Sequence, residues 1–110
     1  MRAPLPPSRI KDPALASAGA LKIAWADRHM PVLRRAADGI ASRASLKGLR
    51  VGISVHLEAK TACLALALQR GGAEVAVTGS NPLSTQDDVC AGLAAAGPTV
   101  YAWHNPTPAD

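Results

Sequence analysis

One histidine of this sequence stands where ligands bind in proteins with an open α/β sheet. His56 directly follows Leu49 to Val55, a run rich in Val, Ile and Leu that predicts a strand buried on both faces. Ligands of open α/β sheets bind outside the carboxyl ends of such strands. Imidazole titrates near neutral pH and is the commonest proton carrier of enzymes. His56 is therefore a candidate for proton transfer, although the residue type alone favours a hydrogen-bonded structural histidine.

Polar residues also follow the next predicted strand. Ala73 to Thr78 is a short strand-like run, and the turn sequence Gly79-Ser80-Asn81-Pro82 comes directly after it. Ser84 and Asp87 have the spacing of a capping box, so we expect Ser84 to open a helix that continues through Ala96. This structural role is sufficient to explain Ser84.

The segments around these polar residues alternate between strands and helices. Apolar residues from Ala62 to Leu68 predict a helix, and Gly71 and Gly72 supply left-handed positions that end it. Gly97-Pro98 ends the following helix, and Thr99 to Trp103 then predicts a third strand.

Because a helix joins each pair of neighbouring strands, we expect the strands to be parallel. The predicted fold class is α/β, a three-layer Rossmann-like parallel sheet preceded by two N-terminal helices. His56, Gly79 and Ser80 should then lie at one edge of that sheet.

Two helices are expected before the sheet. Asp12-Pro13 gives an N-cap followed by proline at the first helical position, and Pro31 should interrupt this helix and start a second one that runs to about Ser42. The expected organisation is a flexible Pro-rich N-terminus at 1–11, a partial domain at 12–104 and a linker or truncated end at 105–110.

The composition is that of one globular domain. The chain has 110 residues, which is enough for one hydrophobic core only. Its 48% of hydrophobic residues and its mean hydropathy near zero are typical of a globular protein. No apolar run approaches the roughly 20 residues that cross a bilayer, and the Pro-containing N-terminus lacks the apolar segment of a signal peptide. We therefore expect a cytoplasmic protein with no membrane partner. Cys63 and Cys90 fall within predicted helices without metal-site spacing, which predicts buried free thiols.

The net charge of +4 is unevenly distributed. Ten of the twelve Lys and Arg residues lie in the first fifty residues. They are spread along predicted helices without interleaved aromatic residues or a known motif. A solvated or partner-facing helix surface is therefore favoured over binding to nucleic acid.

Several common site motifs are absent from the sequence. No GxGxxG follows a predicted strand, and Gly71-Gly72 lies at a helix end, where it cannot direct backbone donors at a pyrophosphate. Walker, HExxH and GxSxG patterns are also absent. We therefore expect this chain alone to bind neither NAD nor a metal.

Four strings of the sequence together resemble one enzyme family. In this order and spacing they are HLEAKTA (56–62), GGAEV (71–75), GSNPLSTQDDV (79–89) and VYAW (100–103). They resemble the amino-terminal part of adenosylhomocysteinase, and so does an upstream segment that contains Asp12, Leu15, Ala16, Trp25, Ala26 and Met30-Pro31-Val32. The resemblance covers Asp12 to His104. Its HLEAKTA form is closer to the bacterial and archaeal branch than to the animal branch, which reads HMTVETA there.

The resemblance implies that residues 12–104 are a partial substrate domain with a nucleoside pocket. It gives His56 a proton-transfer or substrate-positioning role near the ribose. The other substrate-binding residues that it implies are Glu58, Lys60, Thr61, Ser80 and Asn81. Glu58 and Lys60 depart from the animal pattern, which has Thr and Glu there. Recognition of the base therefore stays open, with S-inosylhomocysteine as an alternative substrate.

The family hydrolyses S-adenosylhomocysteine reversibly to adenosine and homocysteine, a step of one-carbon metabolism. The resemblance implies that tightly held NAD oxidises the ribose 3′-hydroxyl, homocysteine is eliminated, water adds and the ketone is reduced again. It also implies that the NAD-binding segment and most catalytic groups lie beyond this chain, in a complete enzyme that is a homo-oligomer. We therefore expect the chain alone to be inactive and to need the missing C-terminal segment as its partner.

Two other classes of function stay open. A stand-alone interaction or regulatory module that pairs with the full enzyme would need no catalytic half and would expose apolar surface. A small binding domain of receiver or flavodoxin type fits less well, because a receiver needs clustered acids at its strand ends. Here the first two predicted strands end at His56 and Gly79.

Overall fold

The computed structural model describes residues 3–110. Residues 1–2, which belong to the stretch expected to be flexible, lie outside the described residues. In chain order the elements are β1 (Arg9–Ile10), the 3-10 helix η1 (Pro13–Leu15), α1 (Ala16–Arg28), α2 (Pro31–Arg43), β2 (Arg50–Val55), α3 (Ala59–Arg70), β3 (Glu74–Gly79), α4 (Asp87–Ala95) and β4 (Thr99–Ala102).

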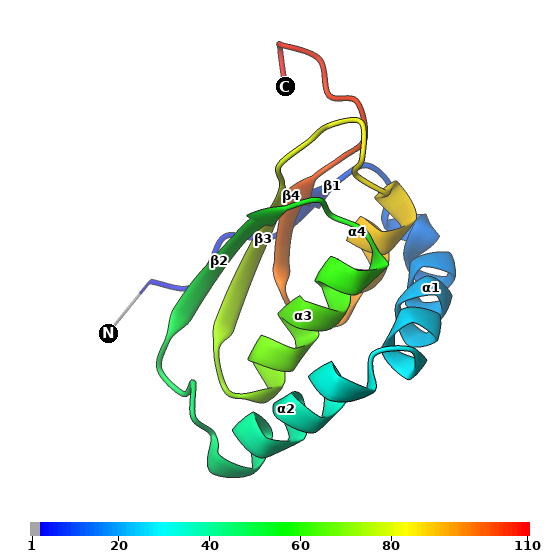
Figure 1. The fold of residues 1–110 in the computed structure, drawn as a ribbon. Coiled ribbons are helices and arrows are strands. Elements are labelled where there is room, and N and C mark those ends of the chain that lie inside the picture. Colours follow the sequence, from blue (N-terminus) through cyan, green and yellow to red (C-terminus); the bar gives the residue numbers. More distant parts are fainter. Residues whose placement is uncertain (1–2) are drawn as a thin grey trace.

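Four strands form one parallel sheet in the order β1-β4-β3-β2 (Figure 1). β2 and β3 pair along their whole length, from Arg50 opposite Glu74 to Val55 opposite Gly79. The α-helical crossovers between β2, β3 and β4 explain why these strands are parallel. The predicted parallel α/β fold is confirmed.

The helices all lie on one side of the sheet. Figure 1 shows α3 and α4 beside the sheet, with α1 and α2 further out. α1 packs on α4 and α3, and α2 packs on α3. Successive crossovers of the same hand place their helices on one face when the strands also follow one another in the sheet. The three layers are therefore one sheet and two layers of helices.

The opposite face of the sheet carries small side chains together with Tyr101. Gly52 and Thr78 are exposed on it, and residues 3–8 run across part of it. The guanidinium of Arg50 donates a hydrogen bond to the backbone oxygen of Ala3, which ties this segment to β2. This face is therefore covered in part by the N-terminal segment and not by helices.

The sequence pattern does not indicate β1, which contains two residues only. β1 pairs with Tyr101 and Ala102 of β4, and Val100 N donates to Ser8 Oγ at 2.9 Å just before it. The guanidinium of Arg9 lies 5.8 Å from the centre of the Tyr101 ring. Two residues are too few to show a period, so the free edge of β4 and its backbone groups determine this strand.

The core is built from small aliphatic side chains and sulfur. Its largest fully buried members are Leu57, Leu93, Val89, Val100 and Cys90. Both cysteines are buried and free, which confirms the prediction of buried thiols. Within residues 3–110, no helix has the length and apolar character needed to cross a membrane.

Two predicted helix starts are confirmed. Asp12 Oδ1 accepts a hydrogen bond from Ala14 N at 2.9 Å and caps η1, which leads directly into α1. α2 begins at Pro31, as expected from the position of that proline.

The predicted capping box at Ser84 is wrong. α4 begins at Asp87, and its N-cap is Gln86, whose side chain makes no capping hydrogen bond. The carboxylate of Asp87 accepts a hydrogen bond from His104 N at 2.7 Å, so a long-range partner takes the group that a capping box would use. Ser84 belongs to the preceding turn, where its backbone N–H donates to Asn81 O at 3.2 Å.

α1 crosses α4 at two glycines. A Cβ added at Gly19 would lie 1.7 Å from Asp88 O, and one added at Gly92 would lie 2.7 Å from Ala20 N. The two helix backbones are therefore in direct contact, which only residues without a side chain permit. Lys22 and Asp88 form an ion pair of 2.7 Å beside this crossing.

Gly19→Ala is expected to lower the free energy of unfolding by about 3 kcal/mol, the upper part of the range for overpacking, because a backbone oxygen cannot yield as a side chain can. Gly39→Ala is the matched control. It lies inside α2, and its Cβ would meet only the Arg43 side chain at 3.7 Å. This control should be neutral or stabilising by up to about 1 kcal/mol. Urea unfolding of both variants measures the difference, and equal stabilities would show that α1 and α4 do not touch in solution.

Candidate functional site

Three loops follow the carboxyl ends of β2, β3 and β4 and lie at one edge of the sheet (Figure 1). His56 directly follows β2, Ser80 directly follows β3, and His104 comes shortly after β4. β2 and β3 end level with each other, because Val55 pairs with Gly79. The prediction that His56, Gly79 and Ser80 share one edge is confirmed.

Backbone hydrogen bonds hold the loops after β2 and β3 together. Ser80 N donates to Val55 O at 3.1 Å, and Gln86 N donates to Leu57 O at 3.1 Å. The side chain of Leu57 is fully buried and anchors the first loop in the core. The two loops therefore form one unit at the sheet edge.

The imidazole of His56 lies where these two loops meet. His56 is exposed, and its Nδ1 lies 2.6 Å from Ser84 Oγ. Its backbone oxygen accepts a hydrogen bond from the hydroxyl of Thr61, a buried residue. The ring is thus held through one nitrogen, which leaves Nε2 for a ligand.

The start of α3 carries three of the residues that the family resemblance assigns to substrate binding. Glu58 is the N-cap of α3, and its Oε1 accepts a hydrogen bond from Thr61 N at 3.1 Å. Thr61 is buried, whereas Lys60 is exposed on the first turn. Glu58 and Thr61 therefore shape the loop that carries His56, and the ammonium of Lys60 lies in solvent.

Ser80 and Asn81 are both exposed on the second loop. Asn81 Oδ1 accepts a hydrogen bond from Leu83 N at 2.8 Å, which forms an Asx turn and fixes the side chain. Asn81 O accepts from Thr85 Oγ1 at 3.0 Å. The side-chain amide nitrogen of Asn81 keeps its donor capacity at the sheet edge.

The structure connects His56 to Asn81 through Ser84, for which the sequence predicted only a capping role. Ser84 Oγ donates to Asn81 O at 3.2 Å. A signal for this turn is present in the sequence, because a serine three residues after another turn residue often donates to its backbone oxygen. His104 also reaches this loop, where its Nδ1 donates to Thr85 O at 3.0 Å.

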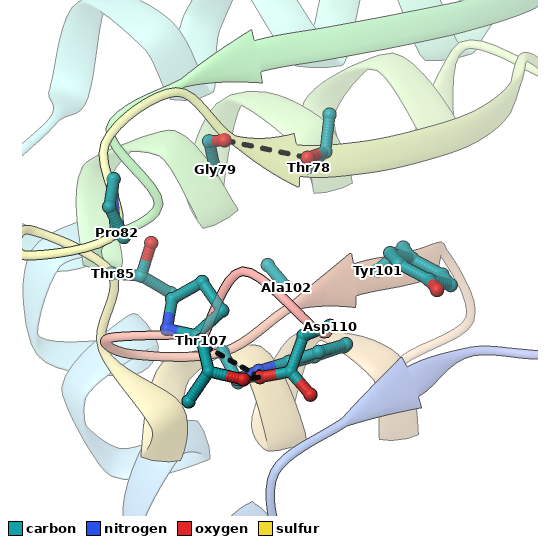
Figure 2. A pocket seen from close by; sticks show the side chains of 10 residues that line it. Thr78, Gly79, Pro82, Thr85, Tyr101, Ala102, Thr107 and Asp110 are labelled. Atoms are coloured by element: carbon teal, nitrogen blue, oxygen red, sulfur yellow. Dashed lines mark hydrogen bonds between the residues drawn. The ribbon is translucent and has the colours of Figure 1, made fainter.

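A cavity of about 270 Å³ lies beside this unit, between the ends of β3 and β4 and the C-terminal residues (Figure 2). Its volume falls just below the roughly 300–1,000 Å³ of typical small-molecule pockets. None of the site residues predicted from the sequence lines it. The cavity is lined by Thr78, Gly79, Pro82, Thr85, Tyr101, Ala102, Trp103, Pro106, Thr107 and Asp110.

Polar groups at the C-terminal wall of this cavity bind one another. Thr107 N and Trp103 Nε1 donate to Asp110 Oδ2 at 2.7 and 3.2 Å, and Figure 2 shows Thr107 facing Asp110. The hydrogen bond from the Thr107 backbone, followed by that from Trp103, lowers the pKa of Asp110. Because these groups are already paired, we place the candidate site on the two loops around His56 rather than in this cavity.

The described residues do not fit a dinucleotide or a metal ion. The turn between β2 and α3 contains no glycine, and the Glu58 carboxylate occupies the N-terminus of α3, where a pyrophosphate would bind. Within residues 3–110, no three His, Cys, Asp or Glu side chains are grouped so that they could hold a metal. The candidate site offers hydrogen-bonding side chains and the imidazole of His56.

A parallel sheet whose polar residues follow the strand ends defines a Rossmann-like α/β domain of the class that binds small molecules at this edge. A family model described as S-adenosyl-L-homocysteine hydrolase matches residues 7–110. The chain belongs to this family.

Curated relatives agree with the family match. The chain is 52% identical over 100 residues to S-inosyl-L-homocysteine hydrolase of Methanococcus maripaludis, a match that covers 91% of the chain and 24% of the relative. It is 48% identical over 102 residues to adenosylhomocysteinase of Sulfolobus acidocaldarius, which covers 93% and 25%, respectively. For adenosylhomocysteinase of Thermotoga maritima the identity is 54% over 84 residues, 76% of the chain and 21% of the relative. The chain spans about a quarter of the length of the curated relatives it matches, and the expected archaeal and bacterial branch is confirmed.

The two thiols should be unreactive in the folded chain. Burial, followed by the nearby Asp87 and Asp88 carboxylates, raises the pKa of Cys90 to about 12, and burial also raises the pKa of Cys63. At pH 8 both groups stay protonated, and only the thiolate is a nucleophile. Mass spectrometry should find neither cysteine alkylated by iodoacetamide in buffer and both alkylated in urea. Equally fast alkylation under both conditions would contradict the burial of these residues.

Proposed function

We propose that this chain is the nucleoside-binding part of an enzyme that hydrolyses S-adenosylhomocysteine or its inosyl analogue. The joined pair of loops carries the proposal, because it sets His56, Glu58 and Thr61 beside Ser80 and Asn81 at one edge of the sheet. Membership of the family supports it, as do relatives with both printed activities across this segment.

In this proposal His56 transfers a proton or positions the substrate near the ribose. An exposed imidazole at the junction of both loops supports this role, since imidazole both gives and takes protons near neutral pH. Ser80 and the amide of Asn81 contribute donors to the nucleoside. Glu58 and Thr61 complete the pocket and keep the His56 loop in shape.

The rest of the reaction needs groups from outside this chain. Family enzymes use NAD to oxidise and then reduce the substrate ribose again. The matched relatives are about four times as long as this chain, as their 24% coverage indicates. We infer that their remaining length includes an NAD-binding segment, and that the complete enzyme is a cytoplasmic homo-oligomer.

A second candidate function is a module that binds and regulates a complete enzyme. The outer helices support it, because Leu21, Trp25 and Val32 are 74%, 59% and 82% exposed. Apolar side chains this exposed are suited to contact with another protein surface. Both candidates predict a partner, but only the first predicts that the partner gains activity that it lacks alone.

The pure chain should release no homocysteine from S-adenosylhomocysteine above the blank, even with added NAD, because it holds no group that oxidises the ribose. Adding the C-terminal remainder of the Thermotoga maritima relative, inactive by itself, should produce turnover. His56→Ala should then lower kcat by about 10²- to 10⁴-fold, the usual contribution of a general acid or base.

His29→Ala is the matched control, since His29 is also exposed but lies at the end of α1. It should leave turnover unchanged. Turnover by the chain alone would contradict the proposal, and so would an active mixture that His56→Ala does not affect. Modulation of an intact relative, without any complementation, would favour the second candidate.

Within the same proposal, the exposed ammonium of Lys60 favours the inosyl substrate over the adenosyl one. Lys60 stands where the animal branch has Glu, so a donor replaces an acceptor. The amino group of adenine donates, whereas the oxygen of hypoxanthine accepts. Relatives named S-inosyl-L-homocysteine hydrolase support this direction of preference. The alternative is that Lys60 lies on the solvent side of α3 and does not contact the base.

We expect the complemented enzyme to accept the inosyl thioether at least as well as the adenosyl one, as measured by kcat/KM. Lys60→Glu should shift the ratio of the two kcat/KM values roughly tenfold toward the adenosyl substrate, about the size of one hydrogen bond. Lys47→Glu makes the same charge change before β2, at the opposite edge of the sheet, and should leave the ratio unchanged. If the Lys60→Glu variant keeps the parent ratio, Lys60 does not read the base.

A further inference from the structure

The direction of the hydrogen bond between His56 and Ser84 depends on which ring nitrogen of His56 carries the proton. His56 Nδ1 lies 2.6 Å from Ser84 Oγ, and Ser84 Oγ donates to Asn81 O at 3.2 Å. A hydroxyl has one proton to donate, and a backbone oxygen can only accept. While Ser84 donates to Asn81, its oxygen can only accept from His56. Nδ1 is then the protonated nitrogen of the neutral ring.

Backbone contacts hold both partners of this hydrogen bond. Ser84 is half-buried, and its N–H donates to Asn81 O at 3.2 Å. The Asx turn from Leu83 N to Asn81 Oδ1, 2.8 Å long, closes the same segment. On the other loop, the Thr61 hydroxyl binds the backbone oxygen of His56. The contact therefore joins two fixed loops and is not a meeting of two freely moving side chains.

We propose that Ser84 is a positioning residue that holds neutral His56 in the tautomer with its proton on Nδ1, so that an unprotonated Nε2 faces away from Ser84. Neutral histidine in water prefers the other tautomer, so Ser84 would reverse the intrinsic preference of the ring. The role of this arrangement in catalysis rests on the proposed function of His56, whereas the tautomer itself does not.

This tautomer suits a group that takes up a proton. A proton accepted at Nε2 comes from the donor that faces it, and the ring becomes an imidazolium with both nitrogens protonated. Nδ1–H keeps its hydrogen bond to Ser84 Oγ in both states, and Ser84 keeps its bond to Asn81 O. No hydroxyl has to rotate when His56 gains or loses the proton.

The ring nitrogens of His56 can be observed by NMR in the ¹⁵N-labelled chain without any ligand, at a pH where histidine is neutral. Long-range ¹H–¹⁵N spectra distinguish a protonated from an unprotonated ring nitrogen, and we expect Nδ1 to be the protonated one. Ser84→Ala should lower the ratio of Nδ1–H to Nε2–H forms by roughly two- to tenfold, the value of one neutral hydrogen bond. Ser84→Thr keeps the hydroxyl and should keep the parent ratio.

Ser54→Ala is the matched control, because it removes an exposed hydroxyl from β2 two residues before His56. It should leave the tautomer unchanged. A parent chain with its proton mainly on Nε2 overturns the proposal, even if Ser84→Ala does not fold. An unchanged ratio in folded Ser84→Ala overturns it as well. The measurement uses no substrate, so its failure is distinct from a failure of the complementation assay, which judges the proposed function.

Discussion

The register between β2 and β3 is the constraint on which the candidate site depends. Val55 opposite Gly79 makes the two strands end level, and this brings Ser80 N within hydrogen-bonding distance of Val55 O. Val75 and Val77 are buried while their neighbours along β3 are not, so burial itself specifies the register. A slip of one residue would turn these valines to the opposite face and separate the loops that hold His56.

The layer of helices stabilises this sheet by close approach rather than by large side chains. A core of Ala, Val, Leu and Cys buries little area per residue, so its stability depends on short distances between many atoms. The contact of Gly19 with the backbone of α4 is the extreme case. The ion pair of Lys22 with Asp88 beside it is half exposed on the lysine side and contributes little by comparison.

Local patterns were enough to predict β2, β3 and β4, the order of the helices and the edge that His56 shares with Ser80, but not β1. Asp12 and Pro31 mark helix starts because caps and prolines act within a few residues of chain. The predictions that failed involve partners distant in sequence. Asp87 has the spacing of a capping box, but its carboxylate accepts a hydrogen bond from His104 N instead. The hydroxyl of Ser84 contacts His56, which lies 28 residues away in the sequence. The proposed roles in substrate binding rest on the family resemblance, since exposed polar side chains have no periodic signal.

β2 has a further consequence as one of the two edge strands of the described sheet. An edge strand presents a row of unpaired N–H and C=O groups to any other extended chain. β2 contains no proline, and Gly52 in its middle leaves open space around the backbone. Its outer side therefore lacks the proline that blocks strand pairing on many sheet edges. A larger assembly can extend the sheet there by one strand without touching the loops at the carboxyl edge.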